Sequence, residues 1–85
     1  MRIVFSPAAL EAKEHFKQHD RKTAEKIRQL IEDIMQNPCS GLGKPEPLKH
    51  DLAGYWSRRI SREHRLVYKV EDDTLYVASC RYHYR

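Results

Sequence analysis

Six side chains of this sequence could together cut RNA without a metal ion. They are one carboxylate, one imidazole, three cations and one phenol, namely Glu46, Lys49, Arg59, Arg65, His83 and Tyr84. When the 2′-hydroxyl of RNA attacks the adjacent phosphate, the protein must supply a base for the hydroxyl, an acid for the departing 5′-oxygen and cations around the phosphorane. Because the attacking group is a 2′-hydroxyl, this chemistry is restricted to RNA. Taken singly, each Lys or Arg of this set is more typical of a solvated surface.

The charge of the chain is moderately basic, and its distribution is more informative than its total. Sixteen Lys and Arg against twelve Asp and Glu give a formal charge of +4, which is by itself a weak sign of a polyanionic partner. Between residues 44 and 65, basic residues outnumber acidic ones, and Tyr55 and Trp56 lie among them. Cations suit phosphates and flat rings suit unstacked bases, so this segment is typical of a nucleic-acid surface. Its basic residues are Lys44, Lys49, Arg58, Arg59, Arg62 and Arg65.

The residues that commonly bind metals do not predict a cofactor. His15 and His19 are spaced i, i+4, with Glu11 one turn earlier, a spacing that could hold a metal on a helix. No further ligand has a suitable spacing, so a solvated helix face is the favoured interpretation. Cys39 and Cys80 match no zinc or redox motif and are expected to stay thiols.

Length and hydropathy limit the class of protein. The 85 residues suffice for one compact domain, which we expect to span residues 1–85. No apolar run approaches the length of a membrane span, and Pro7 interrupts the N-terminus too early for a secretory signal. These features predict a cytoplasmic protein without membrane association.

The first half of the sequence predicts one strand and two helices. Residues 2–5 are typical of a short strand, after which Ser6 and Pro7 form an N-cap followed by proline at the first helical position. The first helix should end near His19, and Asp20 can cap a second helix that ends before Pro38. The apolar positions expected to face the core are Ala9, Ala12 and Phe16 in the first helix, and Ala24, Ile27, Leu30, Ile31, Ile34 and Met35 in the second.

The second half predicts a shaped loop followed by strands. Residues 38–47 contain three prolines and two glycines, which exclude a regular helix or a central strand. Residues 55–60, 65–70 and 74–80 have β character, with a further short strand expected around Lys49. Short connections favour antiparallel hairpins, so we expect an α+β fold of order β-α-α-β-β-β-β, with both helices on one face of a small antiparallel sheet.

Alternation along the strands assigns their faces. Trp56 and Ile60 should lie beneath the helices, opposite Tyr55, Ser57 and Arg59, so that one face is apolar and the other carries arginines. The last strand is apolar on both faces, and its pattern does not place His83.

Four motifs, in this order and at this spacing, carry a resemblance to a known family. The motifs are GLGKPEPLK at residues 41–49, WSRRI at 56–60, HRLVY at 64–68 and RYHY at 81–84. The sequence resembles the YoeB (Txe-type) toxins of bacterial toxin–antitoxin pairs, within the RelE superfamily, over essentially the whole chain.

The resemblance implies a RelE-like fold and an endoribonuclease that cleaves mRNA in the ribosomal A site and so inhibits translation. It implies that Glu46 is the general base, His83 the general acid and Arg65 the stabiliser of the phosphorane. By the same resemblance, Lys49 and Arg59 contact phosphates and Tyr84 orients the reaction. It also implies a cognate antitoxin whose acidic, disordered segment folds onto the basic surface. Arg85 departs from the family pattern, which commonly ends at or near the tyrosine, and it moves the terminal carboxylate away from Tyr84.

Two other functions are compatible with the same fold. A non-catalytic ribosome- or RNA-binding module would use the cations but would not need Glu46 and His83 together. A toxin of the ParE type, which acts on DNA gyrase, would need no RNA-cleaving set. Codon preference, the identity of the antitoxin, and the choice between a monomer and a homodimer are open at this stage.

Overall fold

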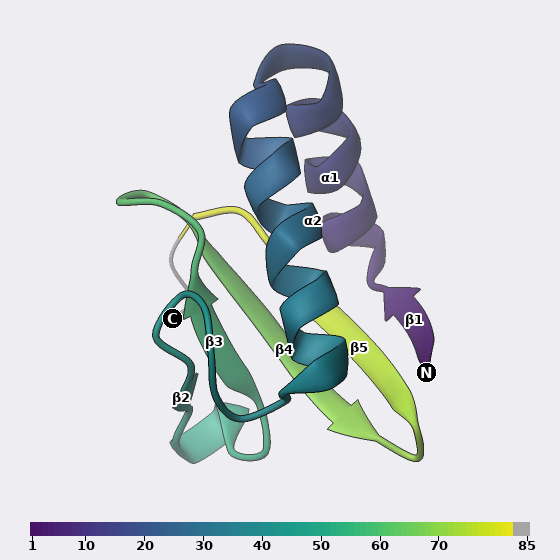
Figure 1. Cartoon of the computed structure of the whole chain (residues 1–85), viewed down its shortest axis with the longest axis vertical. Helices are drawn as coiled ribbons and strands as arrows, with labels where there is room; N and C mark the ends of the chain where they lie inside the picture. Colours follow the sequence, from purple (N-terminus) through teal and green to yellow (C-terminus); the bar gives the residue numbers. More distant parts are fainter. Residues whose placement is uncertain (83–85) are drawn as a thin grey trace.

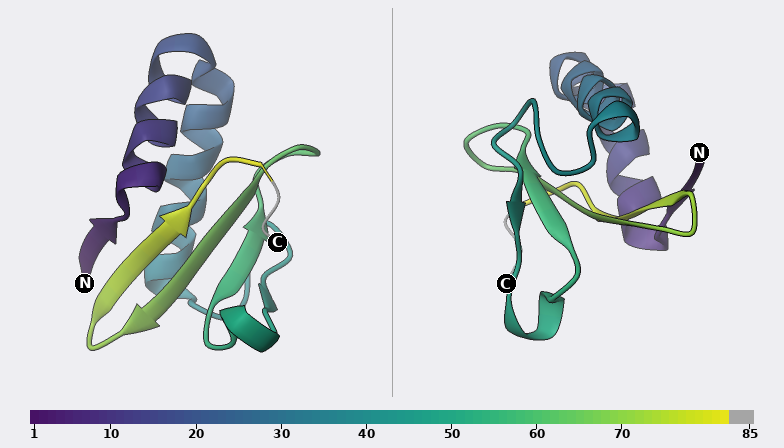
Figure 2. Two further views of the ribbon diagram at one scale, coloured as in Figure 1. Left: turned by 180° about the vertical axis from the view of Figure 1, so that it is seen from behind. Right: turned by 60° about the horizontal axis from the view of Figure 1, so that its bottom comes forward.

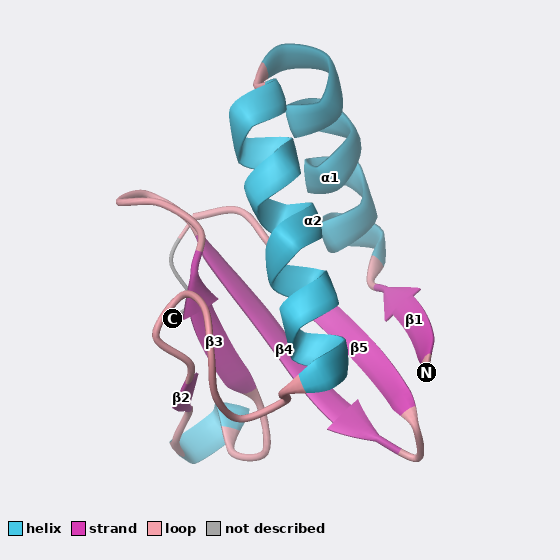
Figure 3. Cartoon of the chain, viewed as in Figure 1, coloured by secondary structure: helices cyan, strands magenta, loops and turns pink. Residues whose placement is uncertain are grey.

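A computed structural model describes residues 1–82 and shows two helices lying across one face of a five-stranded sheet (Figure 1; Figure 3). The pair of helices comes from the first half of the chain, and four of the strands come from the second half. In chain order the elements are β1 (Arg2–Phe5), α1 (Pro7–His19), α2 (Arg21–Gln36), β2 (Glu46–Pro47), the 3-10 turn η1 (His50–Leu52), β3 (Trp56–Arg59), β4 (Arg65–Glu71) and β5 (Thr74–Ser79).

Both helices begin at the predicted caps. The Ser6 Oγ accepts a hydrogen bond from the Ala9 N–H at 3.0 Å and donates one to the Ala78 carbonyl at 2.6 Å, which ties the start of α1 to the sheet. The Asp20 carboxylate accepts the Thr23 N–H at 3.2 Å at the start of α2. Each cap satisfies backbone donors that a helix leaves unpaired in its first turn. The local sequence therefore sets both helix starts, as predicted.

The strand order is β1-β5-β4-β3-β2, and the sheet is mixed. Neighbours from β2 to β5 are antiparallel, whereas β1 pairs in parallel with β5, with Ile3 opposite Leu75. The expectation of an antiparallel sheet was therefore wrong for β1. That expectation came from the short connections between the later strands. No such connection joins β1 to β5, because both helices and three strands lie between them in the chain. Figure 2 shows the helices confined to one side, with the other face of the sheet turned away from them.

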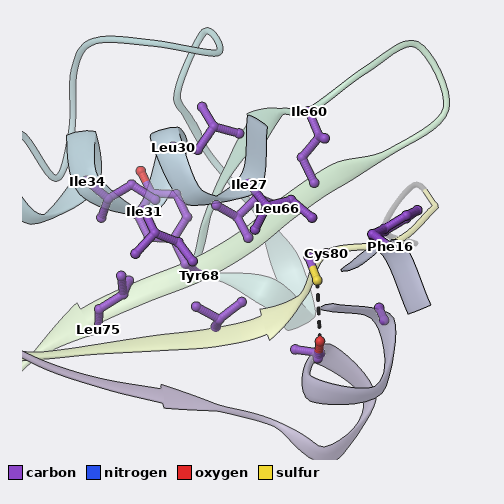
Figure 4. Packing of buried hydrophobic residues seen from close by; sticks show 13 residues of the cluster. Phe16, Ile27, Leu30, Ile31, Ile34, Ile60, Leu66, Tyr68, Leu75 and Cys80 are labelled. Carbon is purple, nitrogen blue, oxygen red and sulfur yellow. Dashed lines mark hydrogen bonds between the residues drawn. The ribbon is translucent and has the colours of Figure 1, made fainter. Parts of the chain in front are cut away.

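The core lies between the helices and the strands β4 and β5 (Figure 4). The buried residues of α1 are the three predicted ones, and those of α2 are Ile27, Leu30, Ile31 and Ile34. Two positions that were predicted to face the core are less buried than expected. Ala24 is partly buried, and Met35 is exposed. The Cys80 thiol donates to the Ala9 carbonyl at 3.4 Å, and burial raises the pKa of this thiol to about 11. Cys80 therefore stays protonated and belongs to the core.

Arg58 departs from the expected distribution of arginines. It lies in β3 on the same face as Trp56 and Ile60, beneath the helices, and its side chain is fully buried. Its guanidinium forms a salt bridge with Asp33 of α2 at 2.5 Å and donates to the Tyr68 hydroxyl at 3.1 Å. Further bonds reach the carbonyl oxygens of Asn37, Ser40 and Leu42. The expectation that this face is purely apolar was therefore wrong at one position, where polar partners compensate a buried charge.

The partners of Arg58 hold the loop between α2 and β2. The Asp33 carboxylate also accepts the Leu42 N–H at 3.0 Å, and the Arg58 hydrogen bond keeps the pKa of this carboxyl below its usual value. Gly43 has a φ of 78°, and a Cβ there would stand 2.9 Å from the Arg59 carbonyl oxygen. Only glycine allows the loop to approach β3 this closely. The Gly43 carbonyl accepts the Arg59 N–H at 2.6 Å, which brings the chain alongside β3 just before Glu46.

The hydropathy of the helices gives no sign of a membrane span. Within the part of the chain that the structure describes, neither helix is long and apolar enough to cross a bilayer.

Candidate functional site

The register of three strands gathers predicted site residues on the face of the sheet opposite the helices. In β3, Trp56 packs against the core, so alternation turns Ser57 and Arg59 to the other face. Glu46 of β2 lies directly opposite Ser57, and Arg59 lies directly opposite Arg65 of β4. Residues opposite each other in adjacent strands share a face, so Glu46, Arg59 and Arg65 lie on one surface. Diagonal neighbours such as Glu46 and Arg59 are about 7–8 Å apart at their α-carbons, within reach of long side chains.

The opposed pair of arginines is a physically costly arrangement in the free protein. Arg59 is exposed and Arg65 is half-buried, and like charges directly opposite in a sheet destabilise it. Among the salt bridges within residues 1–82, none involves either arginine. An anion bound between the two guanidinium groups would relieve this repulsion, and a phosphate suits their planar, forked donors.

Glu46 and Lys49 line one hollow. The hollow has a volume of about 410 Å³, is lined by residues 46–52, and lies between β2 and η1. Both side chains are exposed, and the Lys49 carbonyl accepts the Leu52 N–H at 3.1 Å as η1 begins. The short strand expected around Lys49 lies instead at Glu46–Pro47, since Lys49 is the residue that precedes the 3-10 turn. The carboxylate and the amine are thus brought to the same edge of the sheet.

The C-terminal segment reaches Arg65. The Arg65 N–H donates to the Tyr82 carbonyl at 3.0 Å, and an Arg65 guanidinium N–H donates to the Ser61 carbonyl at 3.2 Å. These bonds hold both the backbone and the side chain of Arg65. The other two predicted catalytic residues, His83 and Tyr84, lie outside the described residues, as does Arg85.

The basic segment is less available to a polyanion than its composition suggests. Of its six basic residues, Arg58 is buried and bound within the fold, so it cannot contact a nucleic acid. The prediction that all six residues belong to a nucleic-acid surface was therefore wrong for Arg58. Arg65 is half-buried, and the exposed members are Lys44, Lys49, Arg59 and Arg62.

The histidines of α1 form a ring contact. The rings of His15 and His19 stand 4.9 Å apart, and desolvation and then the nearby Arg81 lower the pKa of His15. Within residues 1–82, no group of three or more His, Cys, Asp or Glu residues is arranged to hold a metal ion.

Sequence reasoning gave no role to His64 or Tyr82, although both lie in the motifs quoted above. The Tyr82 N–H donates to the His64 Nδ1 at 2.8 Å. No periodic pattern could have revealed this contact, because the two residues are far apart in the chain and neither belongs to a strand.

A second hollow, of about 810 Å³, runs along β1 and the two helices. Its apolar lining includes Ile3 and Met35, both exposed. Basic residues outnumber acidic ones in its lining, with Lys13, Lys17, Arg21 and Arg28 against Glu25 and Glu32. Its chemistry suits an amphipathic, acidic segment.

Comparisons with known proteins give one consistent result. A family model described as a YoeB-like toxin of bacterial type II toxin–antitoxin systems matches residues 5–84. Toxin YoeB of Streptomyces coelicolor is 54% identical over 84 residues, which cover 99% of this chain and 100% of that protein.

Solved structures agree in three dimensions. A YoeB/ParE toxin from Agrobacterium tumefaciens is 46% identical, with a TM-score of 0.96 over 99% of this chain and 100% of that one. YoeB of Staphylococcus aureus, solved in complex with YefM and as a dimer, is 49% and 50% identical in the two structures. Both superpose with a TM-score of 0.92 over 99% of this chain and 98% of that one.

Proposed function

This chain belongs to the YoeB-like toxins of bacterial type II toxin–antitoxin systems, and we propose that it inhibits translation as a metal-independent endoribonuclease that cleaves mRNA in the ribosomal A site. The proposal is supported chiefly by the cross-strand register, which sets Glu46 beside the opposed pair Arg59 and Arg65 on one face of the sheet. A carboxylate next to two cations is the combination that a 2′-hydroxyl attack on phosphate uses.

The proposed reaction needs only groups of this chain and of the RNA. The Glu46 carboxylate takes the proton of the 2′-hydroxyl, and the 2′-oxygen forms a bond to phosphorus. The bond from phosphorus to the 5′-oxygen then breaks, and His83 gives that oxygen a proton. The products are a 2′,3′-cyclic phosphate and a 5′-hydroxyl, with Glu46 protonated and His83 neutral until water exchanges their protons.

The cations act on the charge that develops at phosphorus. Arg65 is proposed to bind the phosphorane, because its guanidinium is oriented by the Ser61 carbonyl and its backbone by Tyr82. Lys49 and Arg59 are proposed to contact the flanking phosphates, and Tyr84 to orient the reacting groups. Donors that are fixed before the reaction stabilise charge without a further cost of reorganisation.

Cleavage in the presence of a chelator tests the function directly. Ribosomes programmed with a defined mRNA are incubated with the protein, and EDTA is added at a concentration that leaves the ribosomes intact. We expect cleavage to continue and to leave a 2′,3′-cyclic phosphate with a 5′-hydroxyl. Loss of cleavage on chelation, restored by Mg²⁺ or Zn²⁺, would contradict the mechanism. Absence of cleavage with binding retained would favour a binding module.

Replacing Arg65 by alanine separates catalysis from docking. We expect turnover to fall by about 10²–10³, the usual effect of removing one transition-state donor, while the affinity for programmed ribosomes changes little. Arg62→Ala, an exposed cation in the turn before β4, is the matched control and should affect neither quantity strongly. The two quantities are measured by single-turnover cleavage and by ribosome co-sedimentation. A parallel fall of both in Arg65→Ala would assign the residue to docking.

Partners of the protein follow from the same proposal. Its substrate would be mRNA on cytoplasmic ribosomes, and its inhibitor an antitoxin with an acidic, disordered segment. The apolar hollow with its basic lining along β1 and the helices supports such a partner. An antitoxin of this kind should suppress cleavage in the assay above, and an acidic partner that binds without suppressing it would contradict the inhibitory role.

Self-association as a homodimer is tested by analytical ultracentrifugation, where a single monomeric species would exclude it.

A further inference from the structure

The backbone of Tyr82 is held from both sides. Its N–H donates to the His64 Nδ1 at 2.8 Å, and its carbonyl accepts the Arg65 N–H at 3.0 Å. Tyr82 also has a φ of 61°, in the left-handed region that residues other than glycine seldom occupy. Such a conformation persists only where its surroundings impose it. Two consecutive residues of the chain, His64 and Arg65, supply the bonds that impose it here.

His64 is itself fixed, so it can act as a rigid support. Its carbonyl accepts the N–H groups of Ile60 at 3.1 Å and Ser61 at 3.2 Å, and its own N–H donates to the Ser61 Oγ at 3.3 Å. Its ring meets that of Phe16 of α1 edge-on, with centroids 5.0 Å apart. The turn before β4 therefore fixes the backbone of His64, and the buried Phe16 fixes its ring.

The side chain of Tyr82 also contacts His64 and Arg81. Its ring lies 5.6 Å from the His64 ring, and the Arg81 guanidinium stands 4.8 Å from its centroid. More than half of the surface of Tyr82 is exposed, so burial does not explain its conformation. Among the described residues, the hydrogen bonds from His64 and Arg65 are the contacts that act on the Tyr82 backbone directly.

We propose that His64 is a positioning residue of the toxin, which acts through Tyr82 on the direction in which the chain continues to His83. An Nδ1 that accepts a hydrogen bond is unprotonated, so the imidazole carries its proton on Nε2. This inference rests on the proposed function, because that function gives His83 its role as the acid. The misplacement of a reacting group by about 1 Å can cost about 10²-fold in rate, so a support of this kind affects turnover.

Three substitutions at His64 distinguish the hydrogen bond from the ring. His64→Asn keeps an acceptor near the position of Nδ1, His64→Gln carries its amide farther out, and His64→Phe keeps only the ring contacts. We expect single-turnover cleavage to fall by about 10²-fold in the Gln and Phe variants, with KM nearly unchanged, and to be largely retained in the Asn variant. Glu63→Gln, an exposed neighbour, is the matched control. Equal defects in all three variants would overturn the proposal.

Coupling to the acid is tested in a double-mutant cycle. If His64 acts through His83, His64→Phe should lower the rate little further in a His83→Ala background. Multiplication of the two defects would show that His64 acts elsewhere, and would overturn the proposal.

A measurement on the intact protein separates this inference from the proposed function. Hydrogen exchange of the Tyr82 amide, followed by NMR, should be at least about tenfold faster in His64→Phe than in the wild type and in His64→Asn, because an accepted bond protects an amide. Unchanged exchange would overturn the inference even if mRNA is cleaved. Faster exchange in a protein that cleaves no mRNA would show that His64 holds Tyr82, while the proposed function had failed.

Discussion

Replacing Arg58 by alanine is expected to lower the free energy of unfolding by about 3–5 kcal/mol, the range measured when one partner of a buried ion pair is removed. The guanidinium is fully buried and bonds to Asp33, to Tyr68 and to three loop carbonyls. Its removal leaves these groups without their donor and opens a cavity. Since small domains are stable by only about 5–15 kcal/mol in total, a large part of the stability should be lost.

Urea unfolding followed by far-UV circular dichroism measures this loss at neutral pH. Arg58→Lys keeps the charge but not the planar fork, so its stability should lie between those of the wild type and the alanine variant. Arg21→Ala, at the exposed start of α2, is the control and should change stability by less than about 0.5 kcal/mol. A change of similar size in Arg58→Ala would mean that the buried contacts of Arg58 contribute nothing to the stability of the fold.

The loss of stability at acid pH provides a second test of the contacts between Arg58 and Asp33. The Arg58 hydrogen bond, with that of the Leu42 N–H, lowers the pKa of Asp33 from its ordinary 3.8. A depressed carboxyl pKa contributes stability that is present above 3.8 and is lost as the pH falls through the folded-state value. Without Arg58 the largest cause of this lowered pKa is lost, so the variant should lose less stability than the wild type as the pH falls below 3.8.

Features of the fold that depend on neighbouring residues could be predicted from the sequence. The helix starts could be predicted from Ser6 with Pro7 and from Asp20, because a capping residue acts within one helical turn. The apolar spacing of Ala9, Ala12 and Phe16 announces the buried face because a helix repeats every 3.6 residues. The alternation of faces along a strand placed Trp56 against the core, where the structure finds it partly buried.

Features that depend on distant partners could not be predicted in this way. The parallel pairing of β1 with β5 joins the two ends of the chain, and nothing in residues 2–5 specifies that partner. In β5 the register changes so that Val67 faces Ser79 while Tyr68 faces Val77. This irregularity leaves Ala78 between two ladder positions and changes the alternation toward the C-terminus. Simple parity therefore could not assign the faces of the last strand.

The candidate site shows the same division. The pattern turned Arg59 away from the core correctly, but it gave no reason to bury Arg58, whose acceptors come from α2 and from a loop of irregular backbone. The meeting of Glu46 with Arg59 and Arg65 required the register of three strands. Residue roles came from the family resemblance, and those of His83 and Tyr84 concern positions outside the described residues.

Replacing His83 by alanine is expected to lower the rate of the chemical step by about 10²–10⁴, the usual contribution of a positioned proton donor. An ordinary imidazole has a pKa of about 6.5. A nearby cation lowers the pKa of any such group, whereas the phosphates of a bound RNA favour its charged form. The acid role is therefore proposed for the RNA-bound complex.

The defect of His83→Ala should shrink when the 5′-oxygen is replaced by sulfur, because a thiolate leaves without being protonated. Glu46→Ala is the matched variant, and its defect should persist on the sulfur substrate, since the 2′-hydroxyl must still lose its proton. Single-turnover rates on the two substrates give both ratios. An equal defect of His83→Ala on oxygen and on sulfur would show that the imidazole positions the RNA or stabilises charge, and is not the acid.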